Sequence, residues 1–297
     1  MRRLALLLLA LLPLTLRGTP ALAEPSEVLR ALEAPSPALG HPLGFVLYLP
    51  PGYEEGHERL PVVYLLHGAQ ASAADWVDQG HVQEIADWLI KAHRLPPLLI
   101  VMPEGGTNSW YIDAPDGGSG NVATAIEQDL PAYVERTWRA RTDRRGRAIA
   151  GYSMGGYGAL RFALMAPDRY AAAAAMSGAF WTQVTPETQF DERIQRIFQG
   201  AFGRPFDARR FVAASPMTLA GAMPHGAPVP AIYLTCGTSD RFHLDREQAV
   251  MAKRLAAMRI PVETALTPGD HDWETWSKAL PAVLEFLARP FAAGVRS

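Results

Sequence analysis

The sequence predicts an α/β protein with a mostly parallel sheet that is covered by helices on both faces. Short runs of apolar and β-branched residues alternate along the chain with longer segments whose apolar residues recur at helical spacing. This alternation is typical of strands joined by crossover helices. The composition agrees, because 48% of the 297 residues are hydrophobic and 20% are charged, as in ordinary globular proteins. The formal net charge of −2 offers no strongly basic surface, so we expect no nucleic acid partner.

Three strands and one helix are expected in the first part of the chain. Residues 45–49 form a short apolar run that ends at a Pro-Pro-Gly turn. Residues 61–66 and 98–102 are continuous apolar runs, which suit strands buried on both faces of a sheet. Between them, residues 82–92 have the apolar spacing of a helix.

The rest of the chain continues this alternation. A helix is expected over residues 122–138, and Pro131 inside it should kink or restart the helix. The strands that follow are expected at 148–150, 171–176, 231–236 and 262–267, and the helices at 155–166, 245–258 and 273–287.

Two segments do not follow this rhythm. Residues 24–42 contain several prolines and no clear apolar period, so we expect an extended leader before a single domain at 43–297. After the sixth strand region, residues 180–230 lack a clean strand and end in a stretch rich in proline and glycine. We interpret 180–230 as an insertion over one end of the sheet.

The N-terminus has the pattern of a secretory signal peptide, residues 1–23. A positive start at Met1-Arg2-Arg3 precedes an unbroken apolar run at 4–12, and Ala21-Leu22-Ala23 offers a small-x-small cleavage site. We therefore expect cleavage after Ala23 and a secreted or periplasmic protein. The alternative is a membrane anchor, but the run is shorter than the roughly 20 apolar residues that a spanning helix needs. No stable membrane anchor is expected.

The segment Gly151-Tyr152-Ser153-Met154-Gly155 matches the G-x-S-x-G pattern of a nucleophile elbow. A short expected strand precedes it and an expected helix follows it, which is the setting that the pattern requires. The turn is sterically tight, so the residues flanking the serine must be small. We predict that Ser153 is a catalytic nucleophile.

A serine hydroxyl needs a base and an acid partner, which follow it along the chain in this arrangement. His271 follows the last expected strand, whereas His225 lies in the insertion and His243 precedes a helix. We therefore predict His271 as the base. Asp240 follows a buried strand and is the predicted acid; Asp245 is the alternative, although a carboxylate at the start of a helix has a structural role.

Backbone N–H groups must stabilise the negative charge that develops on the substrate oxygen. We predict that Met154 donates one, because it follows the nucleophile, and that Ala69 donates the other from the His67-Gly68-Ala69 loop. His67 is interpreted as a packed histidine that orders this loop. No histidine or carboxylate cluster has the spacing of a metal site, and no cofactor is expected.

With these residues placed, the chain resembles the putative esterase family of α/β-hydrolases. This family includes esterase D and S-formylglutathione hydrolase, tributyrin and feruloyl esterases, and the antigen 85 mycolyltransferases. The resemblance implies the α/β-hydrolase fold, a triad of Ser153, Asp240 and His271, and oxyanion donors at Ala69 and Met154. It fades between residues 180 and 230. The matching stretches are Tyr64-Leu65-Leu66-His67-Gly68, Asn108-Ser109-Trp110-Tyr111, Glu127-Gln128-Asp129-Leu130-Pro131, the ten residues from Gly151 to Leu160, Cys236-Gly237-Thr238-Ser239-Asp240 and Gly269-Asp270-His271-Asp272-Trp273.

The resulting hypothesis is an exported serine carboxylesterase that acts on a small-molecule or carbohydrate-linked ester. The alternatives are an acyltransferase of the antigen 85 type, a thioesterase similar to S-formylglutathione hydrolase, and a non-catalytic binding protein. Trp110 and Tyr111 follow a buried strand and Trp181 opens the insertion, so all three are candidates for the wall of the substrate pocket. The alternative for each is that it only packs the insertion onto the sheet.

Overall fold

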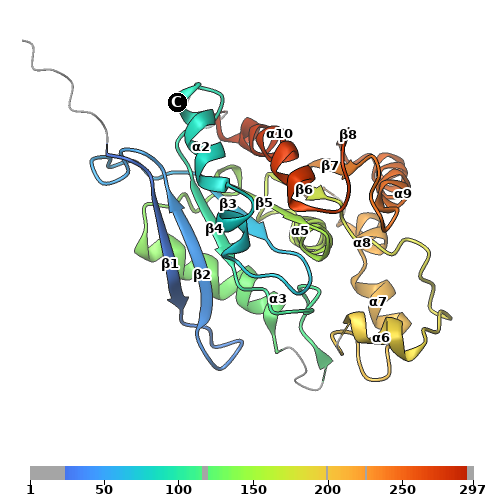
Figure 1. The fold of residues 1–297 in the computed structure, drawn as a ribbon. Coiled ribbons are helices and arrows are strands. Elements are labelled where there is room, and N and C mark those ends of the chain that lie inside the picture. The colour runs from blue at the N-terminus through green and yellow to red at the C-terminus, as the bar shows by residue number, and fades with distance from the viewer. Residues whose placement is uncertain (1–23, 116–119, 199, 225, 293–297) are drawn as a thin grey trace, which may run out of the picture.

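We describe a computed structural model of the chain over residues 24–115, 120–198, 200–224 and 226–292. The predicted signal peptide, residues 1–23, lies outside these residues. Eight strands form one sheet in the order β1-β2-β4-β3-β5-β6-β7-β8 (Figure 1). Strand β2 pairs antiparallel with both β1 and β4. Every other pair of neighbouring strands is parallel. The strands are β1 Glu27–Ala34, β2 Leu43–Leu49, β3 Val62–Leu66, β4 Leu99–Pro103, β5 Arg147–Tyr152, β6 Ala172–Met176, β7 Ala231–Gly237 and β8 Val262–Thr267.

Helices cover both faces of the sheet, as the sequence predicts (Figure 1). Because side chains alternate along a strand, Val63 and Leu65 face one core and Tyr64 and Leu66 face the other. The first core is closed by α1, α2 and α10, and the second by α4, α5 and α9. The helices are α1 Asp75–Asp78, α2 Val82–Lys91, α3 Val122–Thr124, α4 Leu130–Thr137, α5 Met154–Met165, α6 Glu192–Phe198, α7 Ala208–Ala214, α8 Pro216–Ala222, α9 Leu244–Ala257 and α10 Trp273–Ala292.

The prediction of an extended leader over residues 24–42 is wrong. Glu27–Ala34 forms strand β1, which pairs with β2 at one edge of the sheet. The register shifts between Leu29 and Leu32, and Ala31 in between has a φ of 54°. This bulge interrupts the alternation of apolar residues, so the segment carries no clear period in the sequence.

The expected helix at 122–138 is divided into three parts. A short α3 leads into a π-helical turn at η2 Ala125–Asp129, and α4 begins at Leu130. Pro131 lies in the first turn of α4, where its missing N–H costs no hydrogen bond. The restart at Pro131 therefore agrees with the prediction, whereas the wider turn before it was not predicted.

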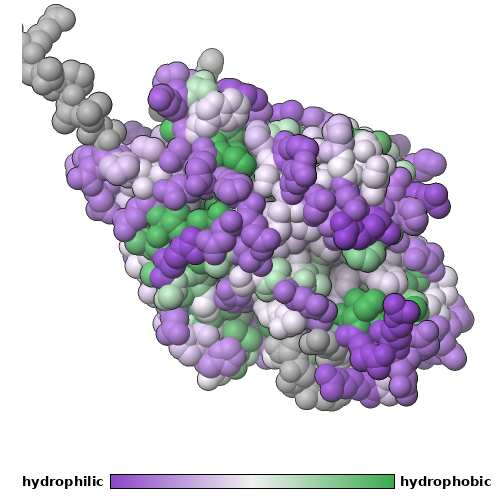
Figure 2. Space-filling view, viewed as in Figure 1, coloured by the Kyte–Doolittle hydropathy of each residue, from purple (hydrophilic) through white to green (hydrophobic). Residues whose placement is uncertain are grey.

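The insertion contributes α6, α7 and α8 between β6 and β7. These helices lie beyond the β6–β8 end of the sheet, opposite the β1–β2 edge (Figure 1). The face of the molecule in Figure 2 is largely hydrophilic, with smaller hydrophobic areas. Among the described residues, no helix is both long and apolar enough to cross a membrane.

Candidate active site

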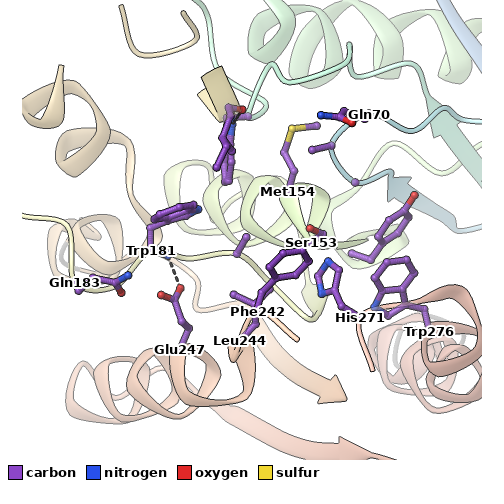
Figure 3. A pocket seen from close by; sticks show the side chains of 16 residues that line it. Gln70, Ser153, Met154, Trp181, Gln183, Phe242, Leu244, Glu247, His271 and Trp276 are labelled. Atoms are coloured by element: carbon purple, nitrogen blue, oxygen red, sulfur yellow. Dashed lines mark hydrogen bonds between the residues drawn. The ribbon is translucent and has the colours of Figure 1, made fainter. Parts of the chain in front are cut away.

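The predicted site residues meet at the carboxyl ends of the parallel strands. Strand β3 has β4 on one side and β5 on the other, so the chain changes direction across the sheet at this point, where open α/β sheets bind ligands. A cavity of about 560 Å³ lies there, and it contains six of the predicted residues (Figure 3). These six are Ala69, Trp110, Ser153, Met154, Trp181 and His271.

Ser153 lies on the turn between β5 and α5 with φ 53° and ψ −118°. A non-glycine residue rarely adopts this conformation, and it persists only where the surroundings hold it. The amide of Ser153 donates to Met176 O at 2.9 Å, which ties the turn to β6. A Cβ atom on Gly155 would lie 2.1 Å from Leu66 O, so α5 can approach the sheet this closely only with glycine there.

His271 and Asp240 form a hydrogen-bonded pair beside Ser153. His271 Nδ1 lies 2.8 Å from Asp240 Oδ2, and the Asp240 side chain is completely buried behind the imidazole. An ionised carboxylate can only accept, so Nδ1 carries a proton, and in the neutral imidazole Nε2 is then the acceptor. Ser153 and His271 lie next to each other at the cavity surface in Figure 3. Asp245, the alternative acid, lies in the first turn of α9.

The surroundings of Asp240 keep its carboxylate ionised. Burial acts to raise the pKa of Asp240, but hydrogen bonds from His271, the Phe242 amide and Ser177 outweigh it, and the pKa lies below the ordinary value. The Phe242 amide donates to Oδ1 at 3.0 Å. The negative charge facing His271 is thus retained although the side chain is buried.

A second ion pair joins the loops that carry Asp240 and His271. Arg241 Nη2 lies 2.7 Å from Asp270 Oδ2, and the Arg241 amide donates to Asp270 Oδ1, also at 2.7 Å. The guanidinium lowers the pKa of Asp270 to about 2. The two loops are therefore linked by this ion pair as well as by the Asp240–His271 hydrogen bond.

Ala69 and Met154, the predicted oxyanion donors, both line the cavity that Ser153 borders. Of the hydrogen bonds formed among the described residues, none uses either amide. His67 orders the loop before Ala69: its Nδ1 lies 2.8 Å from Gly68 O, and its Nε2 accepts from the Gly105 amide at 2.9 Å. Burial lowers the pKa of His67, so the ring is neutral and makes both bonds at once.

Trp110 and Trp181 form an aromatic side of the cavity. Both have a positive φ, 54° and 51°, so the fold holds each tryptophan in a strained backbone conformation. Trp110 Nε1 donates to Ile197 O at 3.2 Å, and both rings pack against Phe198 in α6. The insertion therefore positions this part of the cavity.

Tyr111 does not line the cavity, so its prediction as a substrate residue is wrong. The side chain is completely buried, and its hydroxyl donates to His67 O at 2.9 Å. A Cβ atom on Gly105 or on Gly158 would collide with its ring. Tyr111 thus packs beneath the loop that carries Ala69, and only its neighbour Trp110 reaches the cavity.

With the site described, comparison with known proteins identifies the family. A family model described as "Putative esterase" matches residues 36–287. The chain belongs to the putative esterase family. Esterase MT1326 of Mycobacterium tuberculosis strain CDC 1551 is 29% identical over 257 residues, which are 79% of this chain and 53% of that protein. This esterase-family chain thus spans about half the length of that relative.

Two further comparisons concern the range of the putative esterase family. The diacylglycerol acyltransferase/mycolyltransferase Ag85A of Mycobacterium leprae is 26% identical over 167 residues, which are 53% of this chain and 46% of that protein. A solved ferulic acid esterase is 26% identical and superposes with a TM-score of 0.76, covering 90% of this chain and 99% of that chain. The sheet and these similarities show the α/β-hydrolase fold.

Several cavity residues of this esterase-family member were not predicted from the sequence. Phe242 and Trp276 contact the His271 ring from two sides, edge-on, with centroid distances of 4.9 Å and 5.0 Å. Glu247 in α9 accepts a hydrogen bond from the Trp181 amide (Figure 3). Burial raises the pKa of Glu247, and the amides of the loop that begins the insertion offset this only in part.

Two of these three residues, Phe242 and Trp276, lie close in the sequence to a predicted triad residue and could have been found from it. Phe242 follows the predicted acid by two positions, and Trp276 lies in the first turns of the helix after the predicted base. Glu247 carries no such signal, because its neighbour in space is 66 residues away. Among the described residues, no group of three or more His, Cys, Asp or Glu side chains is arranged to hold a metal ion.

Proposed function

We propose that this chain is an exported serine carboxylesterase that hydrolyses carboxylic esters through an acyl-enzyme intermediate. One observation carries the proposal: the strained Ser153 borders the same cavity as His271, whose imidazole is hydrogen-bonded to the buried Asp240. Membership of the putative esterase family supports it. Export is inferred from the signal-peptide pattern at residues 1–23.

In the first step, Ser153 Oγ attacks the ester carbonyl while His271 Nε2 takes the serine proton. Asp240 holds the imidazole in the tautomer that leaves Nε2 free and stabilises the imidazolium that forms. The amides of Ala69 and Met154 donate to the oxyanion, and they need break no hydrogen bond within the described chain to do so. His271 then gives the proton to the leaving alcohol, and the acyl group stays on Ser153.

In the second step, water attacks the acyl-enzyme with His271 again as the base. The acyl group lies against the aromatic side of the cavity formed by Trp110 and Trp181. The similarity to a mycolyltransferase favours one alternative, in which an alcohol replaces water in this step. Product analysis with a labelled acyl donor, with and without an added alcohol, separates hydrolysis from acyl transfer.

The test of the nucleophile is covalent labelling. A fluorophosphonate probe should modify the wild-type protein at Ser153, and Ser153→Ala should abolish both labelling and the hydrolysis of p-nitrophenyl esters from acetyl to octanoyl. Ser277→Ala is the matched control, because Ser277 lies on α10 outside the cavity. Labelling that persists in Ser153→Ala would rule out the assignment.

A further inference from the structure

Ser177 is a buried serine beside the predicted acid, Asp240. It follows the last residue of β6, and its exposed fraction is 1%. The Ser177 amide donates to Thr235 O at 2.7 Å, and its φ of 44° is unusual for a residue with a side chain. Such a conformation persists only where the surroundings hold it. The fold therefore keeps this side chain in one place.

The Ser177 hydroxyl has three polar neighbours, which are an indole, a thiol and a carboxylate. Trp276 Nε1 donates to Ser177 Oγ at 3.3 Å. Cys236 Sγ lies 3.6 Å from Ser177 Oγ and 3.5 Å from Asp240 Oδ2, so it touches both groups. Burial raises the pKa of the Cys236 thiol to about 12, so the thiol stays neutral and is a weak hydrogen-bond partner.

The proton of the Ser177 hydroxyl is left for Asp240. An indole N–H only donates, so Trp276 occupies a lone pair of Ser177 Oγ and cannot accept its proton. The carboxylate of Asp240 is the strong acceptor beside it. The hydrogen bond from Ser177, like that from His271, opposes the effect of burial on the pKa of Asp240. Hydrogen bonds to an ionised group are short and strong, so this one restrains the carboxylate.

Trp276 also contacts the nucleophile turn and the base. Its ring stacks on Tyr152, the residue before Ser153, with a centroid distance of 4.2 Å. The same ring meets His271 edge-on at 5.0 Å (Figure 3). One indole therefore packs beside the nucleophile turn and the base, and reaches the acid through Ser177.

We propose that Ser177 and Trp276 are positioning residues of the triad. The indole N–H fixes the Ser177 hydroxyl so that its proton points at Asp240, and this hydrogen bond holds the carboxylate against His271 Nδ1. The amides that bind Asp240 belong to its own loop, whereas Ser177 ties the carboxylate to β6 in the sheet. The alternative is a structural serine that only gives the buried indole an acceptor. The proposal rests on the proposed function, because it concerns the acid of that reaction.

The kinetic test removes the hydroxyl. Ser177→Ala should lower kcat for p-nitrophenyl butyrate by about 10- to 100-fold with KM nearly unchanged, because a hydrogen bond to a charged group is lost away from the substrate. Ser36→Ala is the matched control, since Ser36 is also buried and donates to a carboxylate, that of Asp129, at 2.6 Å outside the cavity. It should lower Tm and leave kcat unchanged. An unchanged kcat in Ser177→Ala would overturn the proposal.

A double-mutant cycle tests the role of the Trp276 N–H. Trp276→Phe keeps a ring against His271 but removes the donor, so it should lower kcat by about threefold to tenfold. In the Ser177→Ala background the same change should cost little, because the hydroxyl that the indole orients is gone. The double variant leaves no indole N–H without an acceptor, so it should be at least as stable as Ser177→Ala. Equal effects of Trp276→Phe in both backgrounds would overturn its orienting role.

Proton NMR separates this proposal from the proposed function. The proton between His271 Nδ1 and Asp240 should give a low-field signal in Ser153→Ala, where no turnover is needed, and ¹⁵N-histidine labelling assigns it. Adding Ser177→Ala should shift this signal, whereas adding Ser36→Ala should not. If the signal shifts although the wild type hydrolyses no ester, the positioning role stands and the esterase assignment fails. A signal that stays in place would show that the hydroxyl does not hold the Asp240–His271 pair.

Discussion

Ser153 is held in its conformation by its neighbours on both sides. A serine at φ 53° costs about 1–3 kcal/mol relative to an unstrained one. The glycines at 151 and 155 remove the side chains that would otherwise push the turn away from Leu66. The turn holds the Ser153 hydroxyl above the sheet at the N-terminus of α5. The elbow therefore requires the small glycines beside Ser153 as much as it requires the serine itself.

Substitution of Asp240 tests its role as the acid partner. Asp240→Asn should keep the fold and lower kcat by about 10⁴-fold, because an amide no longer fixes the proton on His271 Nδ1 or stabilises the imidazolium. Asp245→Asn is the matched control and should leave kcat nearly unchanged. Steady-state kinetics and circular dichroism of the two variants measure rate and fold, and the reverse order of effects would transfer the role to Asp245.

Buried His67 should make stability depend on pH. Burial lowers its pKa, so below the ordinary histidine pKa the unfolded chain takes up a proton that the folded chain refuses. The free energy of unfolding therefore has its full value above the ordinary histidine pKa. As the pH is lowered below that pKa, it decreases by up to about 1.4 kcal/mol per pH unit. His67→Asn cannot titrate there and replaces the completely buried imidazole with a smaller side chain, so it should be less stable than the wild type at pH 7.5.

The measurement for His67 is the melting temperature at pH 7.5 and at pH 5. The difference between wild type and His67→Asn should shrink at the lower pH. Exposed His57 serves as the control, and His57→Asn should melt in parallel with wild type. A difference for His67→Asn that is equal at both pH values would show that the ring is not held neutral.

The helices of the insertion form an aromatic cluster rather than a loose lid. Phe198 of α6 contacts six other aromatic rings, including Trp110 and Trp181 of the cavity. Aromatic pairs of this kind stabilise by about 0.5–1.5 kcal/mol each beyond the area they bury. The shape of the cavity beside Trp110 and Trp181 therefore depends on how α6 and α7 pack.

Glu247 should couple helix α9 to the side of the cavity that Trp181 lines. Glu247→Ala removes the carboxylate that accepts the Trp181 amide, so the loop and the Trp181 ring should shift. We expect a loss of about 1–2 kcal/mol, or roughly 2–4 °C in Tm, and a changed kcat/KM ratio between octanoyl and acetyl esters. Glu247→Gln keeps an oxygen acceptor and should retain most of both properties.

Thermal melts and the ester series check the role of Glu247, with Glu274→Ala as the control. Glu274 is an exposed glutamate of α10 whose partner is Lys278, so its loss should change neither quantity. An unchanged octanoyl-to-acetyl ratio in Glu247→Ala would mean that Glu247 does not position Trp181 for substrate.

At the scale of the whole molecule, the order of the strands in the sheet brings the site residues together. Loops after β3, β5, β7 and β8 come from four separate parts of the chain, and parallel pairing brings their ends to one edge. The antiparallel β1 and β2 lie at the far edge and contribute no residue to the active-site cavity.

Export is the prediction that concerns the whole chain. Expressed in a bacterial host, the protein should appear in the periplasm or medium with Glu24 as its first residue, because a signal peptidase cuts after the Ala-x-Ala pattern. N-terminal sequencing and intact mass measure this. Replacing Leu8 by Arg inside the apolar run should retain the precursor in the cytoplasm, whereas an uncleaved, exported wild-type chain would contradict the cleavage prediction.

The local sequence was sufficient to predict most of the strands and helices and the nucleophile elbow at Ser153. Continuous apolar runs and helical spacing depend only on neighbouring residues, so the parallel strands and the α/β class could be predicted. The glycines around Ser153, and the position of Asp240 and His271 directly after strands, were enough to predict where these residues lie in the fold. Strand β1 could not be predicted, because its register bulges at Ala31 and is set by pairing with β2.

Tertiary packing decided what surrounds the predicted residues. Trp110 and Tyr111 are adjacent in the sequence and both aromatic, yet one borders the cavity and the other fills the space beneath a loop, where the missing Cβ atoms of Gly105 and Gly158 leave room for the Tyr111 ring. Glu247 acquires its contact with Trp181 only when α9 docks beside the insertion. The sequence alone determined the class of chemistry, since that depends on residue type and order along strands, whereas the walls of the cavity depend on contacts between segments that are distant in the chain.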